Sequence, residues 1–203
     1  MAGSDVIPVI ISDEVALDAD GISTAASVGN NAALTIGGAL ASGGSVTNAS
    51  GRQVTILSAG NDSGISFTVV GTDVNGSALS ETVTGANAGT ATSSGYFKTI
   101  TSITAVGNPA GNVSAGINNN ALGVIFAGRC RLQGFSTVSG GNAGTINIRN
   151  ASATGTELIQ ARTIGTDSSA EDPFVPQDGV LFVNGCYVTF VVGTVDLMMF
   201  YHA

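Results

Sequence analysis

The stretch from Phe67 to Gly85, FTVVGTDVNGSALSETVTG, contains residue types that a calcium loop would use. Asp73 and Asn75 would offer oxygen ligands at alternate positions, but an EF-hand loop also needs glycine at its sixth position and glutamate at its twelfth. Counted from Asp73, these positions hold alanine and threonine. An Asn-Gly step between alternating strands instead favours a β-hairpin with a type I′ turn. We therefore predict a hairpin, with strands over 67–70 and 78–83, and no metal site.

Groups for acid–base or nucleophilic catalysis are scarce in this chain. His202 is the single histidine and the penultimate residue, whereas a Ser-His-Asp or Cys-His site needs an imidazole with an orienting partner. Glu171 and Asp172 are adjacent in a loop, where both carboxylates are expected to face solvent rather than converge in a cleft. The glycine-rich stretches GNAGT and GNPAGN do not match a phosphate loop, and no lysine is near them. We predict no catalytic site, no cofactor and no enzyme activity.

The charge of the chain argues against nucleic acid as a partner. The formal net charge is −8, and Lys98 is the only lysine. Binding to phosphates needs a basic face, and the closest approach to one is Arg129 with Arg131, which would share a face of a strand. We interpret that pair as an interface or salt-bridge feature. No run of about eighteen apolar residues is present, so we expect no membrane span, and the acidic N-terminus is unlike a secretory signal.

The two cysteines, Cys130 and Cys186, are too far apart in sequence for a zinc or redox motif. They can lie on neighbouring strands. We expect two buried thiols in a protein made in cytoplasm, and whether they pair stays open.

These groups must be positioned by an all-β fold, because short apolar runs bounded by Gly, Asn and Ser dominate and no 3.6-residue period persists. We predict two small antiparallel β-sandwich or jelly-roll-like units in tandem. Residues 1–33 would form an extended N-terminal arm, residues 34–118 the first β domain and residues 122–203 the second, with GINNNALG as the link. One continuous sandwich remains the alternative. The expected strands are 53–57, 65–71, 78–83, 96–106, 112–117, 123–135, 144–149, 157–163, 179–182, 186–192 and 195–201.

Two apolar segments are the candidate interface. VIPVII near the N-terminus contains Pro8, which predicts an edge strand or an extended arm. The C-terminal runs are almost unbroken, as in strands that are buried on both faces. One face would pack in the domain's own core and the other against a neighbouring subunit, although simple closure of the core is an alternative. The candidate contact residues are Val6, Ile7, Val9, Ile10, Ile11, Met198, Met199, Phe200 and Tyr201.

The chain also resembles a known class of proteins. GRQVTILSAGNDSGISFTVVGTDVNGSALSETVTGANAGTATSSGYFKTITSITAVGNPAGNVSAGI (51–117) resembles β-rich modules in virion proteins of tailed double-stranded DNA bacteriophages, notably those of marine and cyanobacterial hosts. GRCRLQGFSTVSGGNAGTINIRNASATGTELIQA and DGVLFVNGCYVTFVVGTVDLMMFYH in the second half are similar to small β domains of such phages. The resemblance carries no catalytic or binding residues with it.

The resemblance implies a virion protein assembled in the host cytoplasm. The leading hypothesis is a capsid decoration or cement protein that binds the major capsid protein in many copies, as a homo-oligomer for which a trimer is one option. A tail or fibre-associated adaptor, bound to tail proteins, is the second reading. A glycan-binding module for host attachment is the third, and it would need an aromatic groove from Tyr96, Phe97 and Tyr187. The acidic loop over 165–179 is expected to be exposed and to face a partner.

Overall fold

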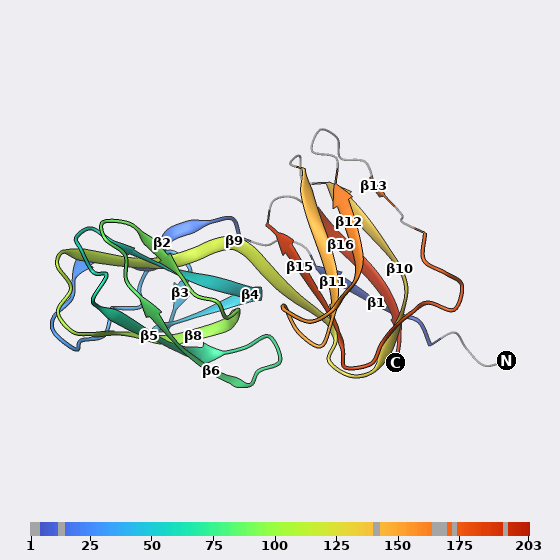
Figure 1. Cartoon of the computed structure of the whole chain (residues 1–203), viewed down its shortest axis with the longest axis horizontal. Coiled ribbons are helices and arrows are strands. Elements are labelled where there is room, and N and C mark those ends of the chain that lie inside the picture. The colour runs from blue at the N-terminus through green and yellow to red at the C-terminus, as the bar shows by residue number, and fades with distance from the viewer. Residues whose placement is uncertain (1–4, 12–14, 140–142, 164–169, 172–173, 193–194) are drawn as a thin grey trace. The chain divides into compact units, whose positions relative to one another are not determined.

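The computed structural model describes residues 5–11, 15–139, 143–163, 170–171, 174–192 and 195–203. Within these ranges the chain forms strands and turns without a helix, so the predicted all-β class is confirmed (Figure 1). Accordingly, the described part of the chain contains no helix that is long and apolar enough to cross a membrane. The strands are β1 (Ile7–Ile11), β2 (Asp18–Ser27), β3 (Ala41–Ser42), β4 (Ser45–Ser58), β5 (Ser66–Thr72), β6 (Ala78–Thr84), β7 (Thr90–Thr92), β8 (Phe97–Val106), β9 (Asn112–Phe126), β10 (Cys130–Ser139), β11 (Gly144–Asn150), β12 (Glu157–Thr163), β13 (Ala170–Glu171), β14 (Val180–Phe182), β15 (Cys186–Val191) and β16 (Val195–His202).

The chain divides into two compact units. Unit 1 comprises residues 1–14 and 120–203, and unit 2 comprises residues 15–119. The N-terminal segment over 1–33 is therefore not one arm, because β1 belongs to unit 1 whereas β2 belongs to unit 2. The reason is pairing: β1 finds a partner in the C-terminal strand β16, and β2 pairs with β9.

Strand β9 passes through the segment that was predicted to be a link. Its residues up to 119 belong to unit 2 and those from 120 onward to unit 1. The expected strand over 123–135 is wrong, because the chain turns between β9 and β10. Two of the three consecutive asparagines form lateral hydrogen bonds through their amides: Asn119 Oδ1 accepts the N–H of Leu17 at 2.6 Å, and Asn118 Nδ2 donates to Gln53 Oε1 at 3.0 Å.

A buried arginine forms hydrogen bonds with residues near the first and last positions of unit 2. Arg52 is 1% exposed and lies in β4. Its guanidinium donates hydrogen bonds to the carbonyl oxygen of Val15, at 2.5 Å, and to that of Asn118. Val15 opens unit 2 and Asn118 is next to its last residue. A planar fork of donors suits two diverging carbonyl groups, which explains why an arginine occupies this position.

Unit 1 is a β-sandwich. One sheet has the order β1-β16-β10-β13, with β14 also pairing with β10, and the facing layer has the order β12-β11-β15-β9. The core between them combines inward side chains of both layers. Leu132 and Met199 come from the first sheet and Ile148 and Val188 from the second, and all four are fully buried. Alternation along each strand, with period two, places these residues on the inner faces.

Unit 2 forms a second, separate core inside a bent antiparallel sheet. Its strand order is β9-β4-β8-β5-β6, with β2 pairing with β9 and with β3 and β7 pairing with β4. The register of β5 against β8 is irregular between Val70 and Gly71, and irregularities of this kind bend a strand locally. The fully buried large aliphatic and aromatic side chains of this core are Ile22, Ile56, Phe67, Phe97, Ile100, Ile103 and Ile117.

The predicted hairpin is present as β5 and β6, but its turn is not of type I′. A loop over 73–77 connects the strands, and Gly76 alone in it has a positive φ, of 81°. Asp73 Oδ1 accepts the N–H groups of Asn75, at 2.8 Å, and Ser77, at 2.9 Å. The carboxylate is thus engaged by the loop's own backbone, which gives it a structural use without a metal.

Candidate functional site

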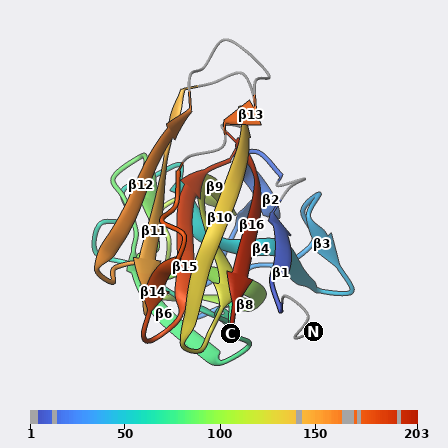
Figure 2. The ribbon, with the colours of Figure 1, turned by 90° about the vertical axis from the view of Figure 1, so that its right-hand side faces the viewer.

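The two apolar segments singled out in the sequence lie side by side in unit 1. β1 pairs antiparallel with β16, so that Ile7 is opposite Tyr201 and Ile10 is opposite Met198. β1 is the last strand of its sheet, and Figure 2 shows it beside β16 at the sheet's edge. Of the two options that Pro8 left open, the edge strand is the one found.

Alternation divides the candidate contact residues into an inner and an outer set. Ile11, Met199 and Tyr201 are at most 9% exposed and belong to the core of unit 1, so their assignment to a partner contact is wrong. Val9 also packs against this core. The residues that remain at the surface are Val6, Ile7, Ile10, Met198 and, half-buried, Phe200.

The inner set is held by specific contacts. A Cβ added to Gly123 of β9 would lie 2.3 Å from Ile11 Cδ1, so Ile11 sits directly against a position where only glycine leaves room. The ring of Tyr201 stacks on that of Phe126, with centroids 5.3 Å apart and an angle of 26° between the planes. β1 is therefore fixed to the core of its own unit.

Of these surface residues, Ile10, Met198 and Phe200 share one face of the β1–β16 pair with Pro8, and we call these four residues the apolar face. Ile7 is opposite the buried Tyr201 and so belongs to the other face. Ile10 is 63% exposed and Met198 is 40% exposed, and the two are opposite each other in the register. Phe200 is opposite Pro8 on one side and Gly134 of β10 on the other. A Cβ on Gly134 would meet nothing within 4 Å, so the space beside Phe200 on that strand is open.

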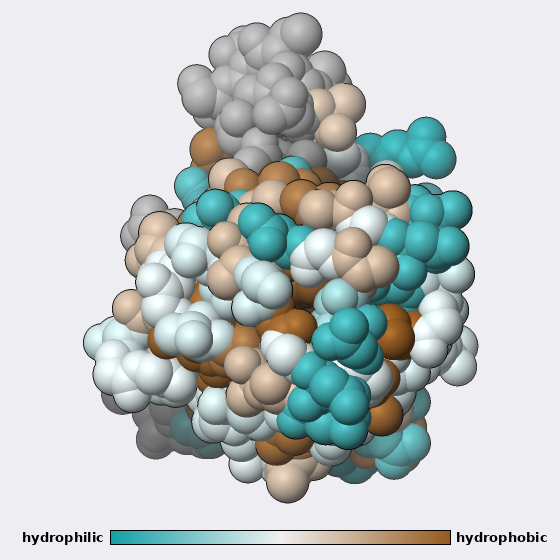
Figure 3. Space-filling model, turned by 90° about the vertical axis from the view of Figure 1, so that its left-hand side faces the viewer, coloured by the Kyte–Doolittle hydropathy of each residue, from teal (hydrophilic) through white to brown (hydrophobic). Residues whose placement is uncertain are grey.

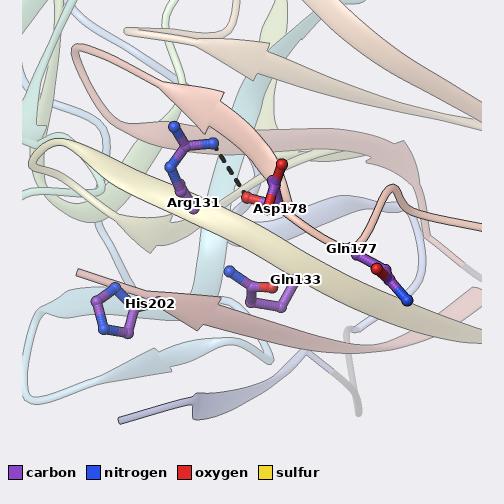
Figure 4. Close-up of a pocket in the computed structure, with 5 residues that line it drawn as sticks. All are labelled: Arg131, Gln133, Gln177, Asp178 and His202. Atoms are coloured by element: carbon purple, nitrogen blue, oxygen red, sulfur yellow. Dashed lines mark hydrogen bonds between the residues drawn. The ribbon is translucent and has the colours of Figure 1, made fainter. Parts of the chain in front are cut away.

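The apolar face is bordered by a polar hollow of about 500 Å³, lined by Arg131, Gln133, Gln177, Asp178 and His202 (Figure 4). His202 follows Phe200 by two residues on β16 and is opposite Arg131 on β10. Arg131 Nη1 donates to the backbone carbonyl oxygens of Asp178, at 3.0 Å, and Gly179, at 3.4 Å.

This hollow was not predicted. Its residues come from two strands and from the segment before β14, which only the tertiary pairing brings together. Arg129 lies in the turn before β10, so the predicted sharing of one strand face with Arg131 is wrong. The openness of the hollow and its mixture of guanidinium, amide, carboxylate and imidazole groups suit a polar rim better than an enclosed reaction site.

The aromatic, metal-ligating and acidic-loop candidates from the sequence do not form a site in the described residues. Phe97 is fully buried in the core of unit 2 and Tyr187 is 5% exposed in unit 1, so the aromatic groove proposed for glycans is wrong. Among the described residues, no three His, Cys, Asp or Glu side chains gather as metal ligands would. Of the acidic loop over 165–179, residues 165–169 and 172–173 lie outside the described residues, and Phe174 is 89% exposed.

One face of the molecule is largely neutral in hydropathy (Figure 3). In the view of Figure 3 most atoms are pale, near neutral hydropathy, with brown and teal atoms scattered among them. This agrees with a chain in which charged residues make up 10% and Gly, Ser and Thr are abundant.

No family model, curated protein or solved structure matches the chain.

Proposed function

We propose that the chain is a structural protein of a tailed bacteriophage virion, most simply a capsid decoration protein, and that it binds its partner through the apolar face of unit 1. The observation that carries the proposal is the exposure of Ile10 and Met198 side by side on the sheet that ends at β1. Adjoining large apolar side chains at a surface are typical of protein contact sites. A low share of charged residues, 10%, fits a surface that is covered in an assembly.

The face of the sheet is a better contact than its edge. An edge strand offers unpaired N–H and C=O groups to an added strand, but β1 has only five residues and contains Pro8, which lacks an N–H. Short edge strands with proline are the usual means of preventing strand addition. We therefore assign the contact to side chains of the apolar face, with the polar hollow around Arg131 and His202 as its rim.

The expected strength per copy is modest. Burying a fully exposed aliphatic side chain contributes about 1.5–3 kcal/mol, and Ile10 and Met198 are partly buried already, so together they contribute roughly 2 kcal/mol. This corresponds to about a thirtyfold change in affinity for one contact. A particle with many symmetric sites makes a weak single contact effective, because bound copies also stabilise the assembly they bind.

The test uses virions that carry the wild-type chain or the variant Ile10→Ser/Met198→Ser, with copies per particle counted by quantitative mass spectrometry. Val106→Ser is the matched control, since Val106 is a strand residue of unit 2 that is 52% exposed. We expect occupancy to fall at least tenfold for the double variant and to stay unchanged for the control. Thermal unfolding of each purified chain verifies that the variants fold.

The outcomes separate the parts of the proposal. Hundreds of copies per particle support decoration of the capsid, whereas a multiple of three, six or twelve places the chain in the tail or its vertex. Absence of the chain from purified virions would overturn the proposal as a whole. Full occupancy by the folded double variant would overturn the assignment of the contact to the apolar face.

A further inference from the structure

Unit 1 contains a corner at which the chain crosses twice between its two layers. After β9 the chain leaves one layer and enters the other at the first residue of β10, Cys130. After β14 it crosses in the opposite direction and returns to the layer of β9 at Cys186, the first residue of β15. Each cysteine is paired with the residue at which the other crossing begins: Cys130 is opposite Phe182, and Cys186 is opposite Phe126.

The two crossings pass close to each other. A Cβ added to Gly185 would lie 2.8 Å from the carbonyl oxygen of Ala127, so the backbones of the two connections are in contact there. Gly185 has a φ of 108°, a conformation that glycine adopts without strain. The corner is therefore fixed by its backbone, and the cysteines that follow each crossing occupy equivalent places on opposite layers.

Both cysteines lie in the buried core of unit 1 beside this corner. Cys130 is 3% exposed, Cys186 is fully buried, and both belong to the core of unit 1. Both are free thiols. The neighbouring Cys186 side chain, as a hydrogen-bond donor, lowers the pKa of Cys130 against the opposing effect of burial. The same hydrogen bond and burial both raise the pKa of Cys186.

We propose that Cys130 and Cys186 are a modification site, at which a small-molecule disulfide oxidises the pair to an intramolecular bridge between the two layers of unit 1. The inference is independent of the proposed function, because it concerns the core of one unit and needs no partner. Disulfides are retained in oxidising surroundings and kept reduced in cytoplasm, so the bridge would form once the chain leaves a reducing compartment.

The chemistry is a pair of thiol–disulfide exchanges. The Cys130 thiolate attacks one sulfur of glutathione disulfide, forms a mixed disulfide and releases one glutathione thiolate. The Cys186 thiol then gives its proton to the released glutathione thiolate and attacks the Cys130 sulfur, which closes the protein bridge and releases the second glutathione thiolate. Two protein thiols lose two protons and two electrons, and one glutathione disulfide is reduced to two glutathione molecules. Cys130 is the first nucleophile because the hydrogen bond from Cys186 favours its thiolate.

The bridge would restrict the unfolded chain over the segment from 130 to 186. Cross-linking a loop of this length strongly reduces the conformational freedom of the unfolded state. Because both cysteines begin strands at the same corner and belong to one core, we expect little strain to offset this gain. We expect the unfolding temperature of unit 1 to rise by roughly 10 °C or more on oxidation.

The test uses the full-length wild-type chain. The reduced, folded protein is incubated with glutathione disulfide, and a second sample is refolded from urea in a glutathione redox buffer, so that slow access to buried thiols does not hide the reaction. Intact mass, thiol titration and mass spectrometry of unreduced peptides identify the bridge, and thermal unfolding with and without dithiothreitol measures its effect. Cys186→Ala is the control, because it leaves Cys130 without a partner.

Each outcome is decisive. Loss of two hydrogen masses, a cross-linked peptide containing Cys130 and Cys186, and a rise in unfolding temperature that dithiothreitol reverses support the proposal. Two free thiols or stable mixed disulfides with glutathione under both protocols would overturn it. A bridge that lowers the unfolding temperature would also overturn it, since the corner would then have to distort to form the bond. Cys186→Ala should show no dithiothreitol-dependent change.

Discussion

Replacing Arg52 by methionine removes the guanidinium that joins the beginning and the end of unit 2. The side chain is 1% exposed and bonds the carbonyl oxygens of Val15 and Asn118. Methionine fills similar space without donors, so the variant isolates the value of the hydrogen bonds. We expect Arg52→Met to destabilise unit 2 and to loosen the end of β9 that carries Asn118.

The magnitude follows from two opposing terms. Two hydrogen bonds from a charged donor contribute roughly 3–6 kcal/mol together. Removing a buried cation also removes its desolvation cost, which is several kcal/mol in buried ion pairs. Val15 is exposed, so water can replace the lost donor there, whereas Asn118 is half-buried and is less easily rehydrated. The balance is a loss of about 2–3 kcal/mol, or a fall in unfolding temperature of roughly 10 °C for a unit of about 100 residues.

The assay is urea unfolding followed by circular dichroism, with hydrogen exchange read by mass spectrometry over residues 112–119. Arg149→Met is the matched control: Arg149 is 23% exposed in its side chain and pairs with Glu157 at 2.8 Å, a contact expected to contribute less than about 1 kcal/mol. Arg52→Lys keeps a buried cation without the fork, so its loss should be at least as large as that of Arg52→Met. A loss for Arg52→Met no larger than for Arg149→Met would refute the reasoning.

Two further predictions concern the hairpin and its neighbour. Asp73→Ala removes the acceptor for two backbone N–H groups of the turn, so we expect thermal unfolding to show a loss of stability of about 1 kcal/mol. Added calcium should leave the unfolding temperature of the wild-type chain unchanged. Stabilisation by calcium would contradict the structural role of Asp73. Gly71→Ala would bring its Cβ to 1.8 Å from the carbonyl oxygen of Thr99, so we expect a loss above about 2 kcal/mol. Gly64→Ala, whose Cβ meets nothing within 4 Å, should be near neutral, and equal losses in the two glycine variants would refute the packing argument.

The sequence predicted the strands well where apolar alternation was unbroken. The ranges around β5, β6, β8, β11, β12 and β16 were anticipated within a few residues, because period-two patterns and Gly/Asn-rich turns report directly on local structure. It was misleading at the three asparagines of β9, where propensity indicates a loop. The strand is continuous there: Asn118 donates a lateral hydrogen bond to Gln53 and Asn119 accepts one from Leu17, and both partners are far away in sequence.

The candidate site shows the same division. Composition and apolar runs drew attention to the segments of β1 and β16, but only their pairing decided that Ile10 and Met198 share an outward face while Ile11 and Met199 share the core. The positions of Cys130 and Cys186 were equally open, since a corner made by two crossings of the chain leaves no local pattern. By itself the sequence determined an all-β chain with few catalytic groups, because those properties depend on residue types and short periods. Which face is exposed and which cysteines share a corner of the core was decided by the tertiary structure, because both depend on strand register between distant segments, where a shift of one residue exchanges inside and outside.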